Sequence, residues 1–335
     1  MHRWNRAALV LLALASAAAP PPAGADGYAA GLAFLTLIDP VEGGKMPVVA
    51  AYPVADSAGV TVLGPYRIDA AQDAAQAEGR FPLIVVSHGT GGDVLGHHDS
   101  LTALARAGFI AATVQHPRDN YRDDSGFGTD LQTIGRPHHI VALIDGVIAD
   151  ARLGPRIDPT RIGMVGHSAG GYTTIVVIGG RPNFALRADY MKANPDDPLM
   201  RRAQAVGGVQ RRPDLALIAD PRVKAAIVMA PALGFVFDAA GLASIKVPLR
   251  IYQAQADEVL PGQWNAERLG RLMPNAPEYQ VLPGAGHFVF IAPCSEEMAR
   301  RAPAICTDPP GIDRAAIHAR LNAEIVDFFQ RTLRP

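Results

Sequence analysis

The sequence predicts one α/β domain, in which a mostly parallel central sheet of about eight strands is flanked by helices. Three observations carry this prediction. Near-continuous Val/Ile/Leu runs are typical of strands that are buried on both faces. These runs alternate along the chain with longer segments of helical period. The 335 residues are 49% hydrophobic and 19% charged, with 33 glycines and 28 prolines, which fits a globular chain with many tight turns.

The elements follow from these patterns in chain order. The strand candidates are 33–39, 47–52, 82–87, 109–115, 161–165, 223–229, 248–253 and 278–282. The helix candidates are 98–107, 137–153, 169–178, 263–272 and 313–332. No helix separates the first two strand candidates, so we expect an antiparallel pair at the N-terminus that leads into the parallel sheet.

The first 25 residues are expected to be an export signal. Arg3 and Arg6 precede an apolar run at 7–19 and a small-x-small cleavage site at 23–25. A membrane anchor is the alternative, but about 13 apolar residues fall short of the roughly 20 that span a bilayer, and no cysteine is present there to take a lipid. We therefore expect a periplasmic or extracellular protein without a stable membrane anchor, whose single domain occupies 26–335.

Residues 181–222 interrupt the alternation of strands and helices. They are rich in Arg, Asp, Pro and Asn, with only a weak helical period near 190–205. An excursion of about 40 residues between a helix and the next strand is a usual place for a lid. We expect a cap-like insertion over the sheet, with a decorated surface loop as the alternative.

The two cysteines, Cys294 and Cys306, lie 12 positions apart. In an oxidising compartment such a pair usually forms a disulfide, which contributes about 3 kcal/mol to stability by the chain-entropy estimate. Two free buried thiols are the alternative. A zinc site is not expected, because no C-x-x-C pattern occurs.

No other metal site is expected either. The polar run 119–130 suggests a calcium loop, but Tyr121 and Asp124 stand where an EF-hand needs an oxygen ligand and a glycine. We expect this run to frame the mouth of the active site instead. The adjacent histidine pairs at 97–98 and 138–139 cannot both face one metal from a helix, so we expect helix-start or surface residues there.

Residues 166–170, Gly-His-Ser-Ala-Gly, join a strand candidate to a helix candidate, which is the context of a G-x-S-x-G nucleophile elbow. So sharp a turn forces strained backbone angles on the serine and requires small neighbours. The helix N-terminus then favours the negative charge that develops beside the hydroxyl. We predict that Ser168 is a nucleophile; a purely structural turn is the alternative.

A serine nucleophile needs an imidazole to remove its proton and a carboxylate to orient that imidazole. Only two histidines, His287 and His318, lie downstream of Ser168. His318 falls within the last helix candidate, whereas His287 lies in a Gly-rich loop after the last strand candidate. We predict that His287 is the base.

The carboxylate is expected just past the strand candidate 248–253. Asp257 is our prediction, and Glu258 and Asp238 are the alternatives. Glu258 is the immediate neighbour of Asp257. Asp238 lies in the preceding connection, where a turn residue is the simpler interpretation.

The tetrahedral intermediate of acyl transfer needs two backbone N–H donors. We expect one from Ala169, the residue after the nucleophile. The other is expected from Thr90, in the Gly-rich run 87–92 (Ser-His-Gly-Thr-Gly-Gly) that follows a strand candidate. His88 in this run is expected to brace the loop by hydrogen bonding rather than to act as a base.

Four features of the chain resemble those of the α/β-hydrolase superfamily: Ser-His-Gly-Thr-Gly-Gly at 87–92, Gly-His-Ser-Ala-Gly-Gly-Tyr at 166–172, Asp257 after a strand, and Gly-Ala-Gly-His-Phe at 284–288. The resemblance covers residues 32–330. It implies the α/β-hydrolase fold and a Ser-His-Asp triad that works without a cofactor.

Within that superfamily, the chain looks like the exported, predicted dienelactone-hydrolase group that is related to platelet-activating-factor acetylhydrolase. The segments that carry this narrower resemblance are Leu-Thr-Leu-Ile-Asp-Pro at 35–40, Ala-Tyr-Pro at 51–53 and Arg-Pro at 136–137. Dienelactone hydrolases use a cysteine nucleophile, whereas this chain has Ser168. That difference argues against a lactone substrate.

These features predict a secreted serine esterase that cleaves small-molecule carboxylic esters of short acyl chains through an acyl-enzyme intermediate. A nucleic-acid partner is not expected, because the formal net charge is −1 and no basic run occurs. Cutinase-like cleavage of polyesters and lactone hydrolysis are the alternatives, and the insertion at 181–222 argues against a polymer. A catalytically silent binding protein of the same fold is the non-enzyme alternative, which the complete set of catalytic residues disfavours.

Overall fold

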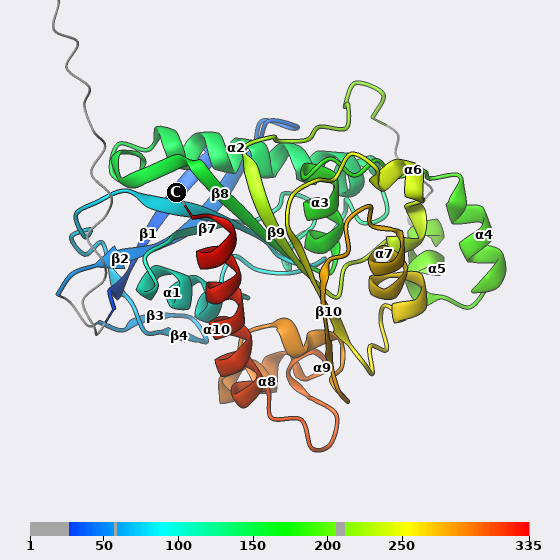
Figure 1. The fold of residues 1–335 in the computed structure, drawn as a ribbon. Helices are drawn as coiled ribbons and strands as arrows, with labels where there is room; N and C mark the ends of the chain where they lie inside the picture. The colour runs from blue at the N-terminus through cyan, green and yellow to red at the C-terminus, as the bar shows by residue number, and fades with distance from the viewer. Residues whose placement is uncertain (1–26, 57–58, 206–211, 335) are drawn as a thin grey trace, which may run out of the picture.

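A computed structural model describes residues 27–56, 59–205 and 212–334 of the chain (Figure 1). The expected export signal lies outside the described residues, and so does part of the expected insertion, 206–211. Within the described ranges, no helix is long and apolar enough to cross a membrane.

The centre of the molecule is a nine-stranded sheet. Its strands are β1 (Ala29–Ile38), β2 (Lys45–Val54), β5 (Ala71–Gln72), β6 (Phe81–Ser87), β7 (Ile110–Val114), β8 (Ile157–His167), β9 (Val223–Met229), β10 (Leu249–Ala254) and β11 (Glu278–Leu282). Their spatial order is β11-β10-β9-β8-β6-β7-β2-β1-β5. β2 pairs antiparallel with both β1 and β7, and all other neighbours are parallel. The predicted mostly parallel sheet, entered by an antiparallel pair, is therefore confirmed.

The sheet has one strand more than the eight candidates, because the two-residue β5 extends it beyond β1. A separate hairpin is formed by β3 (Thr61–Leu63) and β4 (Tyr66–Ile68). Strands of two or three residues are too short to show an alternating pattern, which is why the sequence did not indicate them.

Ten α-helices lie in the described part of the chain. They are α1 (His98–Arg106), α2 (Arg136–Ala149), α3 (Ala169–Val177), α4 (Leu186–Ala193), α5 (Pro198–Ala205), α6 (Ala239–Leu242), α7 (Ala266–Leu272), α8 (Glu296–Arg301), α9 (Pro303–Cys306) and α10 (Arg314–Thr332). α2 ends four residues earlier than its candidate, because Asp150 leaves the helix and its carboxylate accepts the amides of Arg152 and Leu153 instead.

The helices cover both faces of the sheet (Figure 1). In β6, Leu83 and Val85 pack in the core cluster that contains side chains of α2, α3 and α7. Ile84 and Val86 point the other way, into the cluster that contains α1 and α10. A strand covered on both faces must be apolar throughout, which explains the continuous hydrophobic runs in the sequence.

The described part of the insertion 181–222 contains α4 and α5, at the right of Figure 1. These two helices coincide with the weak helical period near 190–205. Tyr190 of α4 stacks on Phe235, with ring centroids 3.8 Å apart, and so attaches the insertion to the segment that follows β9.

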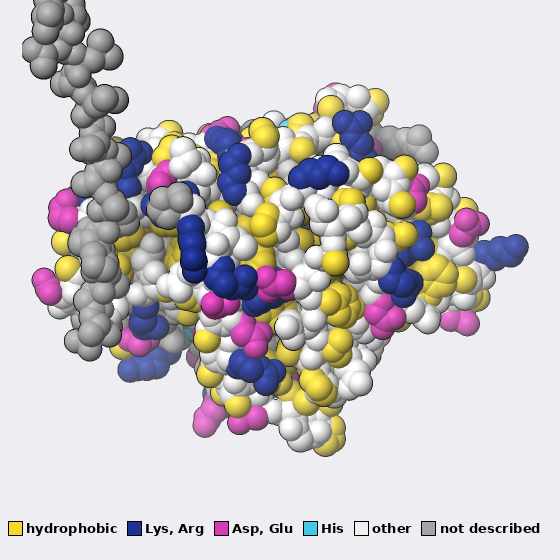
Figure 2. Space-filling model, viewed as in Figure 1, with side chains coloured by type: hydrophobic (Ala, Val, Ile, Leu, Met, Phe, Trp, Pro, Cys, Tyr) yellow, Lys and Arg dark blue, Asp and Glu magenta, His cyan; other side chains and the backbone are white. Residues whose placement is uncertain are grey.

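Cys294 and Cys306 form a disulfide, as the sequence predicted. It closes the segment that carries α8 and α9, between the end of the sheet and α10 (Figure 1). The surface carries charges of both signs. On the face shown in Figure 2, basic and acidic side chains are interspersed, as the net charge of −1 leads one to expect.

Candidate active site

Ser168 lies at the turn between β8 and α3 with φ = 54° and ψ = −118°, the strained conformation that the sequence predicted for an elbow. The turn has no room for larger neighbours. A Cβ on Gly166 would lie 2.1 Å from the carbonyl oxygen of Gly170, and one on Gly170 would lie 1.9 Å from the carbonyl oxygen of Ser87. The amide of Ser168 donates to the carbonyl of Met229 at 2.9 Å, which ties the elbow to β9.

His287 and Asp257 lie in contact at the ends of β11 and β10. The imidazole Nδ1 is 2.8 Å from Oδ2 of Asp257, and both side chains are 3% exposed. The other oxygen, Oδ1, accepts the amides of Val259 at 3.0 Å and Leu260 at 2.7 Å. These amides orient the carboxylate so that one oxygen faces His287. The Nε2 atom of the imidazole then remains for exchange of a proton with a substrate or a nucleophile.

The alternative acids and the alternative base have other roles in the structure. The Glu258 carboxylate accepts the backbone amide of His287 at 3.3 Å rather than its imidazole. Asp238 caps the N-terminus of α6. His318 contacts Asp99 at 2.5 Å on the opposite face of the sheet from α3. The geometry thus favours Asp257 and His287 over these alternatives.

Ser168 and His287 line one cavity of about 230 Å³, together with Thr90 and Ala169. Ser168 is the only partly exposed residue in the stretch 162–170, where its neighbours are buried. Within the described residues, its hydroxyl makes no hydrogen bond. Catalytic hydrogen bonds are commonly long until substrate is bound, so this geometry is compatible with a nucleophile.

The insertion supplies much of the remaining wall of this cavity. Its contributions are Phe184, Arg187, Tyr190, Asp197, Leu199, Met200, Arg202 and Ala203. Further aromatic side chains, Phe127, Phe235 and Phe288, come from three other segments. The cavity wall therefore combines several aromatic side chains with charged side chains from the insertion. Phe127 belongs to the polar run 119–130, which frames this site as we expected.

The loop after β6 approaches the nucleophile closely. A Cβ on Gly89 would lie 3.1 Å from Cβ of Ser168. In the described part of the chain, the amides of Thr90 and Ala169 have no hydrogen-bond acceptor, and both residues line the cavity beside Ser168. Two unpaired N–H groups next to a nucleophile are what an oxyanion hole requires.

Several histidines around the site are buried. The adjacent pairs lie at helix starts, as we expected: His97 is the N-cap of α1, and His139 lies in the first turn of α2. His97 and His139 are buried rather than at the surface, with 4% and 2% exposure. Adjacent residues in a helix point in different directions, so one member of each pair faces the core. Burial lowers the pKa of His88 and His167 well below its usual range, and lowers the pKa of His97 to about 4.

These buried histidines predict that acid destabilises the fold. The unfolded chain binds protons at His88, His97 and His167 below about pH 6.5, whereas the folded chain leaves them neutral. The free energy of unfolding should therefore fall as the pH drops from 6.5 toward 4, by up to about 1.4 kcal/mol per pH unit for each histidine. Thermal unfolding at a series of pH values measures this. A Tm that stays constant between pH 7 and pH 5 would contradict the prediction.

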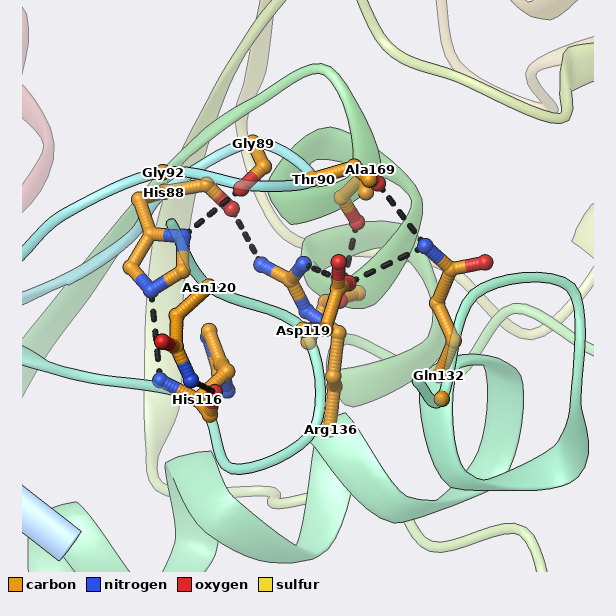
Figure 3. Close-up of polar contacts among 12 residues, drawn as sticks. His88, Gly89, Thr90, Gly92, His116, Asp119, Asn120, Gln132, Arg136 and Ala169 are labelled. Atoms are coloured by element: carbon orange, nitrogen blue, oxygen red, sulfur yellow. Dashed lines mark hydrogen bonds and ion pairs between the residues drawn. The ribbon is translucent and has the colours of Figure 1, made fainter. Parts of the chain in front are cut away.

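Three polar residues that the sequence analysis left without a role lie behind the loop after β6: Asp119, Gln132 and Arg136 (Figure 3). They are distant from the G-x-S-x-G motif along the chain. The sequence placed Asp119 in the run 119–130 and Arg136 in a segment of the narrower resemblance, but no local pattern linked them to the loop after β6. In the described residues, no group of three or more His, Cys, Asp or Glu side chains is arranged to hold a metal ion.

Comparison with known proteins gave matches of two kinds. Residues 83–301 match the model of the alpha/beta hydrolase family. The structure is similar to that of a ferulic acid esterase from Streptomyces cinnamoneus, with a TM-score of 0.64 and 20% sequence identity over 94% of this chain and 93% of that chain. No curated protein sequence matches the chain. At 20% identity, the structural similarity extends to the fold alone.

Proposed function

Since the chain belongs to the alpha/beta hydrolase family, we propose that it is an exported serine esterase that cleaves small-molecule carboxylic esters. The superfamily and the fold expected from the motifs are thus correct. One observation carries the proposal of an esterase: His287, paired with Asp257, lines the same cavity as the strained Ser168 and as two amides that have no acceptor within the described residues.

The proposed reaction has two steps. In the first, the Ser168 hydroxyl oxygen attacks the ester carbonyl carbon while Nε2 of His287 takes the hydroxyl proton. Asp257 stabilises the imidazolium, and the amides of Thr90 and Ala169 donate to the oxyanion. The C–O bond to the alcohol then breaks, and the imidazolium returns the proton to the departing oxygen.

In the second step, His287 removes a proton from water, and the resulting hydroxide oxygen attacks the carbonyl carbon of the acyl-enzyme. The bond to the Ser168 oxygen breaks as His287 protonates that oxygen. The carboxylic acid leaves and the free enzyme is restored. Neither step requires a cofactor, because water is the only co-reactant.

The size of the cavity supports a short acyl chain. A cavity of about 230 Å³ is small beside the roughly 300–1,000 Å³ of ordinary ligand pockets, which favours a short acyl chain. The insertion covers the site, which an extended polymer would need open. An ester of an aromatic acid is a second candidate, favoured by the phenylalanine side chains of the wall.

Export is part of the proposal. A disulfide between Cys294 and Cys306 is typical of proteins that fold in an oxidising compartment. The basic, apolar and small-residue pattern of the first 25 residues is typical of a cleaved signal. We also propose membership of the dienelactone hydrolase and platelet-activating-factor acetylhydrolase-like group, on the sequence segments named above.

Initial rates on p-nitrophenyl esters from acetyl to palmitoyl test the proposed function, together with a fluorophosphonate label mapped by mass spectrometry. We expect the label on Ser168 and the highest kcat/KM on acyl chains of two to about six carbons, since the cavity is small. Methyl esters of cinnamic acids test the second candidate in the same assay. Absence of the label from Ser168 would contradict the proposal.

A further inference from the structure

Behind the loop that follows β6, Asp119 and Arg136 form a fully buried ion pair (Figure 3). Nη1 of Arg136 lies 2.6 Å from Oδ2 of Asp119, and the two side chains are 0% and 1% exposed. Removing both charges from water is costly, and an apolar pair of similar volume is often at least as stable. A buried pair of this kind is therefore weak support for a role in stability, and its contacts need another explanation.

The contacts of the pair converge on the loop that contains Thr90. Nη2 of Arg136 donates to the hydroxyl of Ser87 at 3.1 Å and to the carbonyl of His88. Oδ1 of Asp119 accepts the amide of Gly91 at 3.4 Å. One guanidinium and one carboxylate thus hold the loop on both sides of Thr90.

Gln132 connects the same pair to Thr90 itself. Its Nε2 carries two hydrogens and donates to Oδ2 of Asp119 at 3.0 Å and to the hydroxyl of Thr90 at 2.8 Å. Its Oε1 accepts the amide of Gly128 at 2.9 Å, which fixes the orientation of the side-chain amide. Gln132 lies in a single π-helical turn, Leu131–Gly135, directly before Arg136 opens α2.

The direction of the Thr90 N–H is set by the carbonyl of Gly89, which belongs to the same peptide group. The carbonyl of Gly89 accepts Nδ1 of His88 at 2.7 Å and the amide of Gly92 at 3.1 Å. Nε2 of His88 accepts the amide of His116 at 3.2 Å, so the ring hydrogen is on Nδ1. In a trans peptide, the C=O and the following N–H point in opposite directions. Fixing the Gly89 carbonyl therefore aims the Thr90 N–H away from it.

We propose that Asp119 and Arg136, with Gln132 as their link to Thr90, are positioning residues for the oxyanion hole. This inference rests on the proposed esterase function. Arg136 holds the carbonyl of one peptide, and the next peptide carries the N–H that meets the oxyanion. Because the hydrogen bonds form within the protein, the donor is aimed before substrate arrives. Such preorganisation stabilises the tetrahedral intermediate without a reorganisation cost at the moment of reaction.

Arg136→Lys is the main test. Lysine keeps the positive charge but lacks the planar fork that reaches Asp119 and the loop carbonyl together. Loss of a whole oxyanion donor costs about 10²–10³ in kcat, so a misaimed donor should lower kcat by about 10- to 100-fold. KM should change by less than about threefold, because the ground state depends little on the oxyanion contact.

The inhibition constant of a trifluoromethyl ketone is a second measurement, and it would not change if the three residues were merely structural. The ketone adds to the Ser168 oxygen as a hemiketal, whose negative oxygen occupies the oxyanion hole. Its Ki should therefore rise by the same factor as kcat falls. Thr90→Val is the second variant, because it breaks only the link between Gln132 and Thr90. Gln132→Leu is a third variant, which also removes the hydrogen bonds to Asp119 and Gly128 and alters a residue of the cavity wall. We expect about a three- to tenfold change in both quantities from each.

Arg250→Lys is the matched control. Arg250 is also buried, at 6% exposure, and pairs with Glu278, but it stands at the start of β10, away from the carboxyl ends of the strands where the cavity lies. We expect Arg250→Lys to lower Tm. Its kcat and Ki should stay within twofold of those of the unmodified protein, when active sites are counted by titration.

The outcomes separate the two proposals. If the unmodified protein neither turns over esters nor takes the label at Ser168, the proposed function fails, and this inference fails with it. A second outcome is that the unmodified protein is active, but Arg136→Lys, Thr90→Val and Gln132→Leu all leave kcat and Ki within twofold while Tm falls. In that case Asp119, Gln132 and Arg136 only stabilise the fold. The positioning role is then overturned and the esterase function stands.

Discussion

Ser168→Ala is expected to lower kcat by about three to six orders of magnitude, because it removes the nucleophile that forms the acyl-enzyme. Alanine and serine both carry a Cβ, so the substitution does not change the backbone strain at φ = 54°. Within the described residues, the hydroxyl makes no hydrogen bond, so its loss should leave Tm unchanged to within about 2 °C. Hydrolysis of p-nitrophenyl acetate and a thermal melt on the same preparation measure both quantities.

Ser244→Ala is the control for this substitution. Ser244 is exposed, donates to the carbonyl of Gly179 and does not belong to the cavity wall. The variant should retain full activity. Ester cleavage by Ser168→Ala at a rate similar to that of the control would show that another group performs the reaction.

Asp257→Asn is expected to lower kcat by about three to four orders of magnitude, through the tautomer of His287. The amides of Val259 and Leu260 donate to Oδ1, so the oxygen of an asparagine must take that position. Its NH₂ group then faces Nδ1 of His287 and donates to it. The imidazole proton is consequently placed on Nε2, where it blocks acceptance of the proton from Ser168.

Glu258→Gln is the matched control, since it alters the neighbouring carboxylate and was the alternative acid. Glutamine still accepts the backbone amide of His287, as Glu258 does at 3.3 Å. We expect kcat within about threefold of the unmodified protein. Steady-state rates for the two variants decide between the carboxylates, and a larger loss in Glu258→Gln would reverse the assignment.

The elements of the fold differ in how far the sequence alone predicts them. All eight candidate strands exist. The central ones, such as β6 and β7, were predictable because a strand covered on both faces is apolar along its whole length. The short strands β3, β4 and β5 and the π-helical turn before α2 were not predicted. Their few residues follow no hydrophobic period, and contacts with the rest of the chain determine their conformation.

The residues of the candidate site also differ in how far the sequence alone predicts them. The elbow was predictable, because its glycines, its strand and its helix are neighbours in the sequence. His287 and Asp257 could be proposed from their order and their places after strands. Asp119 and Gln132 could not be assigned, because their function depends on contacts with Thr90 and Gly91, about 30 to 40 positions earlier in the chain.

The sequence by itself determined the sheet, the elbow with Ser168, the places of His287 and Asp257, and the pairing of the cysteines. Each of these depends on local periodicity, on turn chemistry or on the absence of any other partner. Only the tertiary structure decided which histidines are buried, how the insertion covers the cavity, and that Arg136 reaches the loop at Thr90. Those features arise where segments distant in the chain meet, and the packing of side chains there leaves no pattern along the sequence.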